Sequence, residues 1–376
     1  MKFVASSSQL LNSLQAINKV ISNKNTLPIL DNFLFTIEGD MLEIVASDLE
    51  TTMITRMSIT QGSEPGIIAI PARLLIDLLS KFSEQPLTFV INTATFAINI
   101  HSENGQYSLP GNDGTLFPQL PALDTENSAR MEIGSEVLLS GISKTVFATG
   151  DDELRPVMNG IFVELSEDSL TFVASDAHKL VRYRRNDVAP GCAGSFILPK
   201  KPASLLRNVL PKESEKVTIS FDNKNARVDL EGYTMVCRLV EGRYPSYNSV
   251  IPQNNFNHLT IDRVELLSSL RRVQVVANPA SSLVKLELKG NQMDIFTQDV
   301  DFAIAGHETL KCQYEGDPMS IGFKSVFLIE ILSNLSTADV CFQLSDPSRA
   351  GVIVPVQNEE QNEDVLMLLM PMMVNS

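Results

Sequence analysis

The feature that most constrains this chain is one motif that recurs at a fixed, long spacing. Pairs of leucines at 10–11, 138–139 and 266–267 each open a stretch with apolar residues at helical spacing, and residues 11, 139 and 267 are each 128 apart. A repeat of this length is a whole domain, because the units that stack into solenoids have only about 20–50 residues. The sequence therefore predicts three copies of one domain.

Each copy shows the same order of predicted elements. An alternating strand leads into a helix, and capping-box spacing marks the helix start in two copies, with Ser6 and Gln9 in the first and Asp262 and Glu265 in the third. The next element is a proline-marked turn, at Pro28, Pro156 and Pro279. Two runs of alternating apolar and polar residues then predict a β-hairpin, and a second helix and further strands follow.

Short connections between the strands favour antiparallel sheets, and helices placed between such strands favour an α+β fold. We predict three repeated domains, each with two helices packed on antiparallel sheets, at residues 1–127, 128–254 and 255–376. The linkers are expected near 124–130 and 252–257, which are polar and rich in turn-forming residues.

The composition is typical of a globular protein in a reducing compartment. The four cysteines show no C-x-x-C spacing, which argues against a disulfide scaffold and a zinc ribbon. The N-terminus lacks the apolar core of a signal peptide, and the longest apolar run, 365–374, is too short to span a bilayer. These features predict a cytoplasmic protein without a membrane anchor.

The net charge of −15 argues against simple non-specific binding to nucleic acid, but the charge is unevenly distributed. The six predicted helical segments together carry +8, so the remainder of the chain carries −23. These segments are residues 8–24, 71–83, 135–150, 199–212, 262–278 and 322–335. On any single helix, Lys and Arg are ordinary solvated residues. If the helices share one surface, that surface can face a phosphate backbone while the acidic exterior repels DNA.

Enzymatic chemistry has little support in the sequence. His178 lies near Asp176 and could be the general base of a hydrolase, but no G-x-S-x-G elbow accompanies it, and a loop histidine is the simpler interpretation. The acidic run 151–153 lacks the interleaved spacing of a calcium loop, and the histidines show no zinc spacing. We expect no catalytic residue, no metal and no cofactor.

The segment 365–376 is rich in methionine. Val365 to Leu369 is predicted as a final core strand, and Pro371 is expected to end it. The methionines around this proline are flexible and polarizable, which suits a pocket that accepts several apolar peptides.

Seven motifs, in chain order, are shared with one family. They are TLPIL (26–30), SDLE (47–50), IPAR (70–73), SDAHKL (175–180), CRLVEGRYPSY (237–247), IGF (321–323) and LMPM (369–372). Through them the chain resembles, from end to end, the bacterial sliding-clamp family, the beta subunits of the replicative DNA polymerase III holoenzyme. The resemblance implies a non-catalytic processivity factor, in which two three-domain chains close head to tail into a ring around duplex DNA. The implied partners are double-stranded DNA, the polymerase alpha subunit, the clamp loader, other proteins with clamp-binding motifs, and a second copy of the chain.

The same resemblance assigns residues to three surfaces. The partner-peptide pocket would comprise Met158, Ser175, Ala177, His178, Lys179, Leu180, Pro245, Ser249, Val250, Leu368, Met370, Pro371, Met372 and Met373. The residues that face DNA would be Lys24, Arg73, Arg155, Lys200 and Lys201. The joint between subunits would bring Tyr107 and Leu109 of one chain against Val275 and Val276 of the other.

The chain departs from the family pattern in places that bear on peptide preference. Ala177 stands where Gly is frequent, Ser249 stands where some relatives have Arg, and the ending MVNS lacks the usual basic residue after the second Met. Two other interpretations remain open at this stage. One is a repeat-built scaffold that binds peptides without encircling DNA, and the other is a hydrolase that uses His178.

Overall fold

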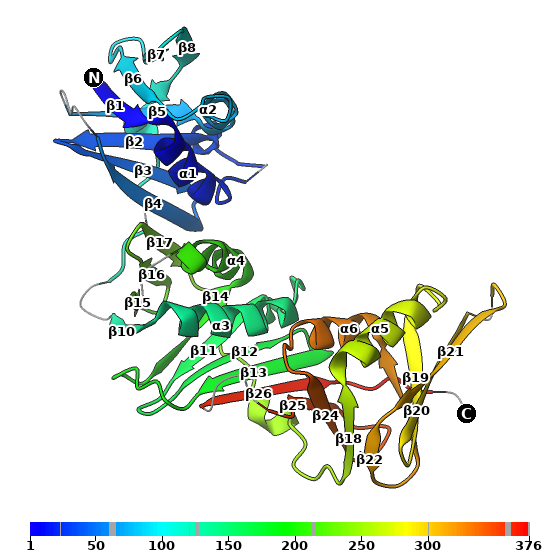
Figure 1. The fold of residues 1–376 in the computed structure, drawn as a ribbon. Coiled ribbons are helices and arrows are strands. Elements are labelled where there is room, and N and C mark those ends of the chain that lie inside the picture. The colour runs from blue at the N-terminus through cyan, green and yellow to red at the C-terminus, as the bar shows by residue number, and fades with distance from the viewer. Residues whose placement is uncertain are drawn as a thin grey trace. The chain divides into compact units, whose positions relative to one another are not determined.

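Antiparallel strand pairing organises the computed structural model into two units (Figure 1). Unit 1 comprises Met1–Glu136 and Ser204–Leu239, and unit 2 comprises Val137–Ala203 and Val240–Ser376. The structure describes residues 1–22, 24–59, 65–119, 121–124, 128–212, 216–299, 301–357 and 362–374.

Each predicted copy contributes two helices at the positions expected from the repeat. They are α1 (Ser7–Asn18), α2 (Ala72–Leu79), α3 (Ser135–Thr145), α4 (Lys200–Val209), α5 (Arg263–Gln274) and α6 (Ser325–Ser333). Both predicted caps are present: the side chain of Ser6 accepts a hydrogen bond from the N–H of Gln9, and Asp262 accepts one from the N–H of Glu265. These bonds satisfy backbone donors that the first helical turn leaves without partners.

Unit 1 contains two antiparallel sheets, one of four strands in the order β1-β6-β7-β8 and one of nine in the order β10-β15-β16-β17-β4-β3-β2-β5-β9. The strands are β1 (Lys2–Ser6), β2 (Asn32–Glu38), β3 (Met41–Ser47), β4 (Thr51–Ser58), β5 (Gly66–Pro71), β6 (Pro86–Ile91), β7 (Ala97–His101), β8 (Gln106–Pro110), β9 (Asn112–Asp113), β10 (Ala129–Gly134), β15 (Lys216–Phe221), β16 (Asn225–Asp229) and β17 (Tyr233–Arg238). In the larger sheet, β4 pairs with β17, from Thr51 opposite Cys237 to Thr55 opposite Tyr233. This pairing joins the first predicted domain to the second.

Unit 2 repeats this arrangement, with a nine-stranded sheet in the order β14-β11-β12-β13-β26-β25-β24-β18-β22 and a four-stranded sheet in the order β21-β20-β19-β23. The strands are β11 (Gly160–Leu165), β12 (Leu170–Ser175), β13 (Lys179–Arg185), β14 (Gly194–Pro199), β18 (Asn257–Asp262), β19 (Leu283–Lys289), β20 (Gln292–Asp299), β21 (Ile304–Lys311), β22 (Gln313–Glu315), β23 (Met319–Lys324), β24 (Asp339–Leu344), β25 (Gly351–Pro355) and β26 (Glu363–Leu369). Here β13 pairs with β26, from Lys179 opposite Leu369 to Arg185 opposite Glu363. Figure 1 shows this sheet passing from green β13 to red β26.

The predicted α+β class with antiparallel sheets is confirmed. The two units divide the second predicted domain, because β10 and β15–β17 belong to one nine-stranded sheet and β11–β14 to the other. The boundaries expected at 127/128 and 254/255 stay predictions, and the linker expected at 124–130 lies partly outside the described residues.

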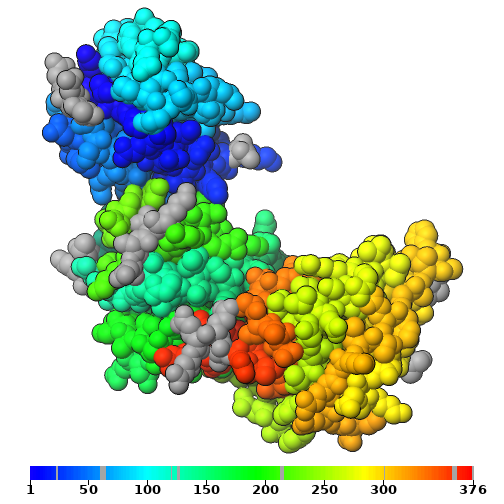
Figure 2. Space-filling view, in the orientation of Figure 1, coloured from blue at the N-terminus to red at the C-terminus, as the bar shows by residue number. Residues whose placement is uncertain are grey.

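The apolar periodicity of the repeat corresponds to burial in each helix. The first leucine of each pair, Leu10, Leu138 and Leu266, is buried. In α3 the close approach to the sheet depends on Gly141, because a Cβ at that position would lie 2.5 Å from the ring of Phe172 on β12. In unit 2, α5 packs against α6, and the space-filling view shows the two helices as one continuous surface (Figure 2).

A buried polar cluster stabilises the pairing of β13 with β26. The carboxylate of Glu363, only 2% exposed, accepts hydrogen bonds from the Tyr183 hydroxyl at 2.6 Å and from Nζ of Lys144 at 2.9 Å. Burial, and then the hydrogen bond to Glu363, raises the pKa of Tyr183. Buried charges are tolerated where partners satisfy them, so removal of one member is expected to be costly.

We predict that Glu363→Ala lowers the free energy of unfolding by about 3–5 kcal/mol, because the cationic Lys144 and the Tyr183 hydroxyl then lose a buried acceptor. Tyr183→Phe leaves the Glu363 carboxylate in place and removes only hydrogen bonds of the hydroxyl, so it is expected to cost less, about 1–1.5 kcal/mol. Urea unfolding measures both values. An equal, small loss in the two variants would show that the carboxylate contributes no more than an ordinary acceptor.

Candidate functional site

The turn at 175–180 follows from its own sequence. Oδ1 of Asp176 accepts hydrogen bonds from the N–H groups of His178 and Lys179, both at 2.9 Å, and the Ser175 hydroxyl donates to the carbonyl of Lys179. Ala177 adopts a left-handed conformation with φ of 73°. Such a conformation favours glycine and costs about 1–2 kcal/mol for a residue with a Cβ. A Gly here, which the resemblance implies as the usual residue, would adopt this conformation without that cost.

The same turn occurs in the first copy. Oδ1 of Asp48 accepts from the N–H groups of Glu50 and Thr51, and Leu49 between them has φ of 77°. The motifs SDLE and SDAHKL therefore encode one backbone structure at the end of two hairpins. Their different side chains give the two turns different surfaces.

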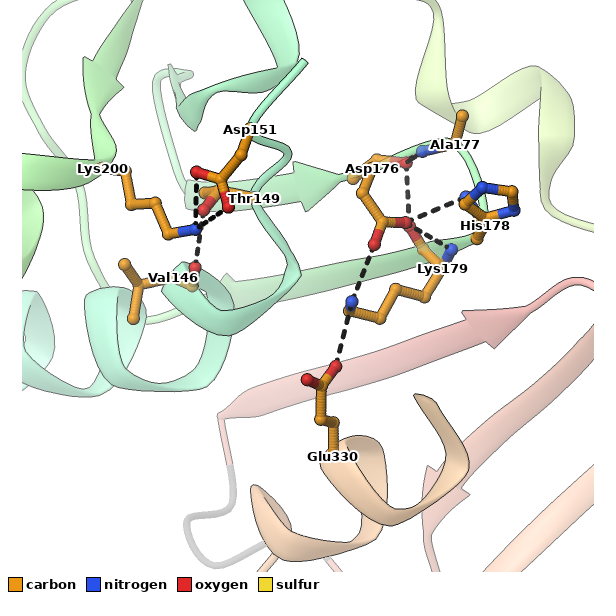
Figure 3. A network of polar contacts seen from close by, with 10 residues as sticks. Val146, Thr149, Asp151, Asp176, Ala177, His178, Lys179, Lys200 and Glu330 are labelled. Carbon is orange, nitrogen blue, oxygen red and sulfur yellow. Dashed lines mark hydrogen bonds and ion pairs between the residues drawn. The ribbon is translucent and has the colours of Figure 1, made fainter. Parts of the chain in front are cut away.

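Lys179 is the centre of a buried ionic network (Figure 3). Its ammonium group lies 2.7 Å from the carboxylate of Asp176 and 3.0 Å from that of Glu330 on α6, and its side chain is 5% exposed. The same ammonium lies 4.4 Å from the ring centroid of Phe327. Lys179 therefore ties β13 to α6, across the junction between the second and third predicted domains.

This network favours the ionised form of the Asp176 carboxylate. Burial acts to raise its pKa, but hydrogen bonds from the Lys179 ammonium and from the N–H groups of Lys179 and His178 outweigh burial, and the pKa is lowered. The carboxylate is thus kept as an anion that compensates the buried ammonium.

His178 is exposed, and its ring stacks on Phe327 at a centroid distance of 5.6 Å. Its carbonyl oxygen accepts a hydrogen bond from the N–H of Met370 at 2.9 Å. The neighbouring hydroxyl, that of Ser175, is engaged with the backbone of Lys179 rather than with the imidazole. His178 therefore has a structural position at the side of the predicted pocket, and this geometry does not support the hydrolase interpretation.

An apolar floor lies between this turn and the end of β26. Leu180 pairs with Leu368 across the two strands, and both belong to one buried cluster. The other buried members are Val173, Ile197, Tyr244, Tyr247, Ile251 and Ala350. Tyr244 stacks on Phe162 at 4.8 Å, which fixes the segment that carries Pro245. The segment 244–251 thus forms part of the same apolar structure.

The rest of the predicted pocket provides exposed apolar groups around this floor. Met370 is 45% exposed, Met373 is 96% exposed and Val250 is 55% exposed. Pro245 and Ser249 are exposed, and Met158, Pro371 and Met372 are half-buried. Contiguous apolar groups left at a surface are typical of sites that bind proteins or peptides.

Three residues of this region were missed at the level of sequence: Phe327, Glu330 and Gly322. The first two lie at helical spacing in the segment FLIEIL, a pattern that gives no reason to expect contact with residues 178 and 179. Gly322 is within the IGF motif, and its carbonyl accepts a hydrogen bond from the N–H of Met372 at 2.8 Å.

The residues predicted to face DNA differ in how far their charge is compensated. The side chain of Arg73 is 97% exposed and its Nε lies 4.0 Å from the carboxylate of Asp77, and Lys24 and Lys201 are also exposed. Nζ of Lys200 lies 2.7 Å from Asp151, and Nε of Arg155 lies 2.9 Å from Asp152 (Figure 3 shows the first pair). The hydrogen bond from the Leu154 N–H, and then that from Arg155, lowers the pKa of Asp152. The acidic run 151–153 therefore acts as a counter-charge.

A polar hollow of about 430 Å³ in unit 1 adds candidates that the sequence did not single out. It is lined by α1, by Ile76 of α2 and by the end of α4, and it contains amide groups and one ammonium group. The lining residues are Asn12, Gln15, Ala16, Asn18, Lys19, Ile76, Asn208 and Val209.

Of the residues predicted for the subunit joint, Tyr107 and Leu109 lie on the edge strand β8, and Val275 and Val276 directly follow α5. Tyr107, on β8, is 38% exposed and contacts Phe82 edge to face at 5.4 Å, whereas Leu109 is 8% exposed and packs inside its own sheet. Val275, which follows α5, is 81% exposed, and Val276 lies beside Gly306 of β21. Tyr107 and Val275 therefore provide most of the accessible surface.

The described ranges contain neither a cluster of metal ligands nor a membrane-spanning helix. No group of three or more His, Cys, Asp or Glu side chains there is arranged to hold a metal ion. Within the same ranges, none of the helices combines the length and the apolar character needed to cross a bilayer.

Comparison with known proteins identifies the family. Three family models match in succession: the N-terminal domain of the DNA polymerase III beta subunit at residues 1–121, its central domain at 132–246 and its C-terminal domain at 248–373. Among curated relatives, the beta sliding clamp of Vibrio cholerae is 26% identical over 359 residues, covering 96% of this chain and 97% of its own. That of Haemophilus influenzae is 28% identical over 349 residues, covering 92% and 93%.

Solved structures agree over the full length of both chains. The DNA polymerase III subunit beta from Pseudomonas aeruginosa is 24% identical with a TM-score of 0.93, a likeness of fold. A sliding clamp from Bartonella birtlesii, solved bound to griselimycin, is 28% identical with a TM-score of 0.91. With three clamp domains matched in order, this chain belongs to the DNA polymerase III beta subunit family, the bacterial sliding clamps.

Proposed function

We propose that this chain works as a DNA sliding clamp, a processivity factor without catalytic activity of its own. Two copies close head to tail into a ring around duplex DNA, and the ring holds the replicative polymerase on its template in the cytoplasm. The observation that supports the ring is the pairing of equivalent strands. Two such pairs, β4 with β17 and β13 with β26, form within the chain, whereas the equivalent strands β8 and β21 each end a sheet.

In each copy a third strand follows the first hairpin, and these equivalent strands are β4, β13 and β21. In the first two copies this strand pairs with the last strand of the next copy, β17 or β26. The strand of the first copy that is equivalent to β17 and β26 is β8, which ends its four-stranded sheet, as β21 ends the other. Since an edge strand presents backbone donors and acceptors in register for pairing, β8 of one subunit and β21 of a second form the missing pair. Two such joints, related by a two-fold axis, close a dimer.

Apolar groups beside β21 support this joint. Gly306 and Glu308 of β21 face α5. Gly306 lies against Val276, and Oε1 of Glu308 accepts a hydrogen bond from Nε of Arg272 at 2.6 Å. Alternation along the strand places Ile304, which is 42% exposed, on the same face. Ile304 and Val275 thus form an apolar surface at the edge, suited to the core of an interface.

Val275→Asp is predicted to convert the dimer to a monomer at micromolar concentration, because it places a charge in the core of the proposed joint. Light scattering measures the mass. The matched control is Val264→Asp on the same helix, also exposed but outside the joint, which is expected to remain dimeric. A monomeric wild-type chain would instead favour the alternative function, a peptide-binding scaffold that does not encircle DNA.

The contact with DNA is proposed to be loose and electrostatic. Exposed cations such as Arg73, Lys24 and Lys201 act at long range on phosphates, and the pairs Lys200–Asp151, Arg155–Asp152 and Arg73–Asp77 limit the total attraction. Amides and Lys19 in the hollow of unit 1 offer additional donors to the phosphate backbone. No base is read, so the ring slides.

Encirclement is tested by comparing how long the protein stays on circular DNA and on linear DNA. After loading by the clamp loader, we expect the protein to stay on closed circular DNA through gel filtration and to leave within minutes once a restriction enzyme linearises the circle. Escape over free ends is the physical reason. Equal retention on both forms would mean that the chain binds DNA by contact and not by topology.

Partners are proposed to bind the surface formed by Leu180, Leu368, Val250, Met370 and Met373. A short apolar or aromatic peptide segment supplies side chains that bury against this floor. The polymerase alpha subunit, the clamp loader and other proteins with clamp-binding motifs use this one site. We further propose that griselimycin, present in the Bartonella birtlesii structure, binds this chain here.

Deletion of residues 370–376 is predicted to abolish binding of the polymerase and the loader while leaving the dimer intact, because the proposed joint uses β8 and β21. Pull-down and light scattering give the two readouts. Val356→Ala, which trims an exposed apolar side chain elsewhere in unit 2, is the control and should bind normally. Loss of the dimer in the deletion would show that the segment belongs to the joint.

A further inference from the structure

The segment Met370–Val374, here called the strap, is docked on the protein by two backbone hydrogen bonds. The N–H of Met370 donates to the carbonyl of His178 at 2.9 Å, on the turn after β12. The N–H of Met372 donates to the carbonyl of Gly322 at 2.8 Å, on β23, and these two residues form an antiparallel bridge. One end of the strap is therefore held by the second predicted domain and the next part by the third.

Gly322 allows the strap to lie this close. A Cβ at this position would meet Cγ2 of Val374 at 2.6 Å, the carbonyl oxygen of Met372 at 2.9 Å and Cδ1 of Leu283 at 2.9 Å. The side chain of Val374 can rotate away, but the carbonyl oxygen is backbone and moves only if the strap moves. Gly322 has no left-handed φ, so its absence of a side chain serves this close approach and not a turn.

The docked backbone determines what the strap presents. Met372 and Val374 are half-buried, whereas Met370 and Met373 project from the surface. A wall that is already ordered does not lose backbone freedom when a peptide binds, and this preorganisation increases affinity.

We infer that Gly322 is a positioning residue for partner binding: it docks the strap so that Met370 and Met373 form a preformed wall of the peptide surface. Gly322 itself does not touch the peptide. This inference rests on the proposed peptide-binding function, and it identifies the docked strap as the segment that determines the affinity for the peptide.

The first experiment measures the strap without any ligand. In hydrogen–deuterium exchange of the wild-type dimer, the amides of Met370 and Met372 are expected to be protected. In Gly322→Ala, the amide of Met372 is expected to exchange faster while those of β13 and β26 keep their protection. An unprotected Met372 amide in the wild type, or unchanged protection in the variant, would overturn the inference.

The second experiment measures binding of a fluorescein-labelled synthetic peptide that carries the clamp-binding segment of the polymerase alpha subunit. We expect Gly322→Ala to raise Kd roughly tenfold, mainly through faster dissociation, with the dimer mass unchanged. Gly351→Ala is the matched control, because its Cβ would meet only side chains, Leu344 at 2.9 Å and Phe323 at 3.3 Å. Equal losses in the two variants would mean general crowding and would overturn the inference.

Two further outcomes separate the inference from the function on which it rests. If the wild type binds no peptide while Met372 is protected and released by Gly322→Ala, the proposed peptide function fails and the docking of the strap stands. If Gly322→Ala does not fold, Val374→Gly provides the second variant, because it removes the side chain that packs on Gly322. Faster exchange at Met372 and weaker peptide binding in Val374→Gly support the inference, and wild-type values for both oppose it.

Discussion

The structure depends on antiparallel backbone pairing between strands that belong to different copies of the repeat. β4 pairs with β17 and β13 pairs with β26, so each nine-stranded sheet contains strands of two copies. Backbone hydrogen bonds of this kind satisfy the edges that a separate domain would leave exposed. Side chains then reinforce the second junction: Glu363 binds Tyr183 and Lys144, and Lys179 binds Glu330.

This construction suits a protein whose action is to stay in place. Continuous sheets hold the copies of the repeat together, and the ionic contacts of Glu363 and Lys179 reinforce the second junction. The proposed site for partners lies at the β13–β26 junction, where the turn 175–180, the segment 244–251 and the strap meet. On this proposal, a partner contacts backbone that hydrogen bonds already hold, which lowers the entropic cost of binding.

Much of the fold could be predicted from the sequence because its signals are local. The 128-residue spacing, the caps at Ser6 and Asp262 and the end of β26 before Pro371 all depend on residues close together in the chain. The candidate pocket was found through motifs shared with a family, and the structure provides a physical reason for several of them, such as the Asp176 turn.

The features that sequence could not provide depend on contacts between distant residues. The resemblance placed Lys179 in the pocket, but no local pattern indicates that its side chain is buried and bound to Asp176 and Glu330. Leu109, predicted for the subunit joint, is 8% exposed, and no local pattern indicates how much of its side chain the rest of its own chain covers. The sequence also gave no sign that β10 and β15–β17 would share a sheet with the first copy, since edge pairing leaves no local pattern.

The left-handed turn has one further implication for how such a chain can evolve. In the first copy it presents the carbonyl of Glu50 to the N–H of Arg238, and in the second it presents that of His178 to the N–H of Met370. The second copy therefore contains both halves of the connection: the acceptor turn at 175–178 and the donor N–H of Arg238 at the end of β17. A module of this kind can pair with a duplicate of itself through backbone contacts that it already has.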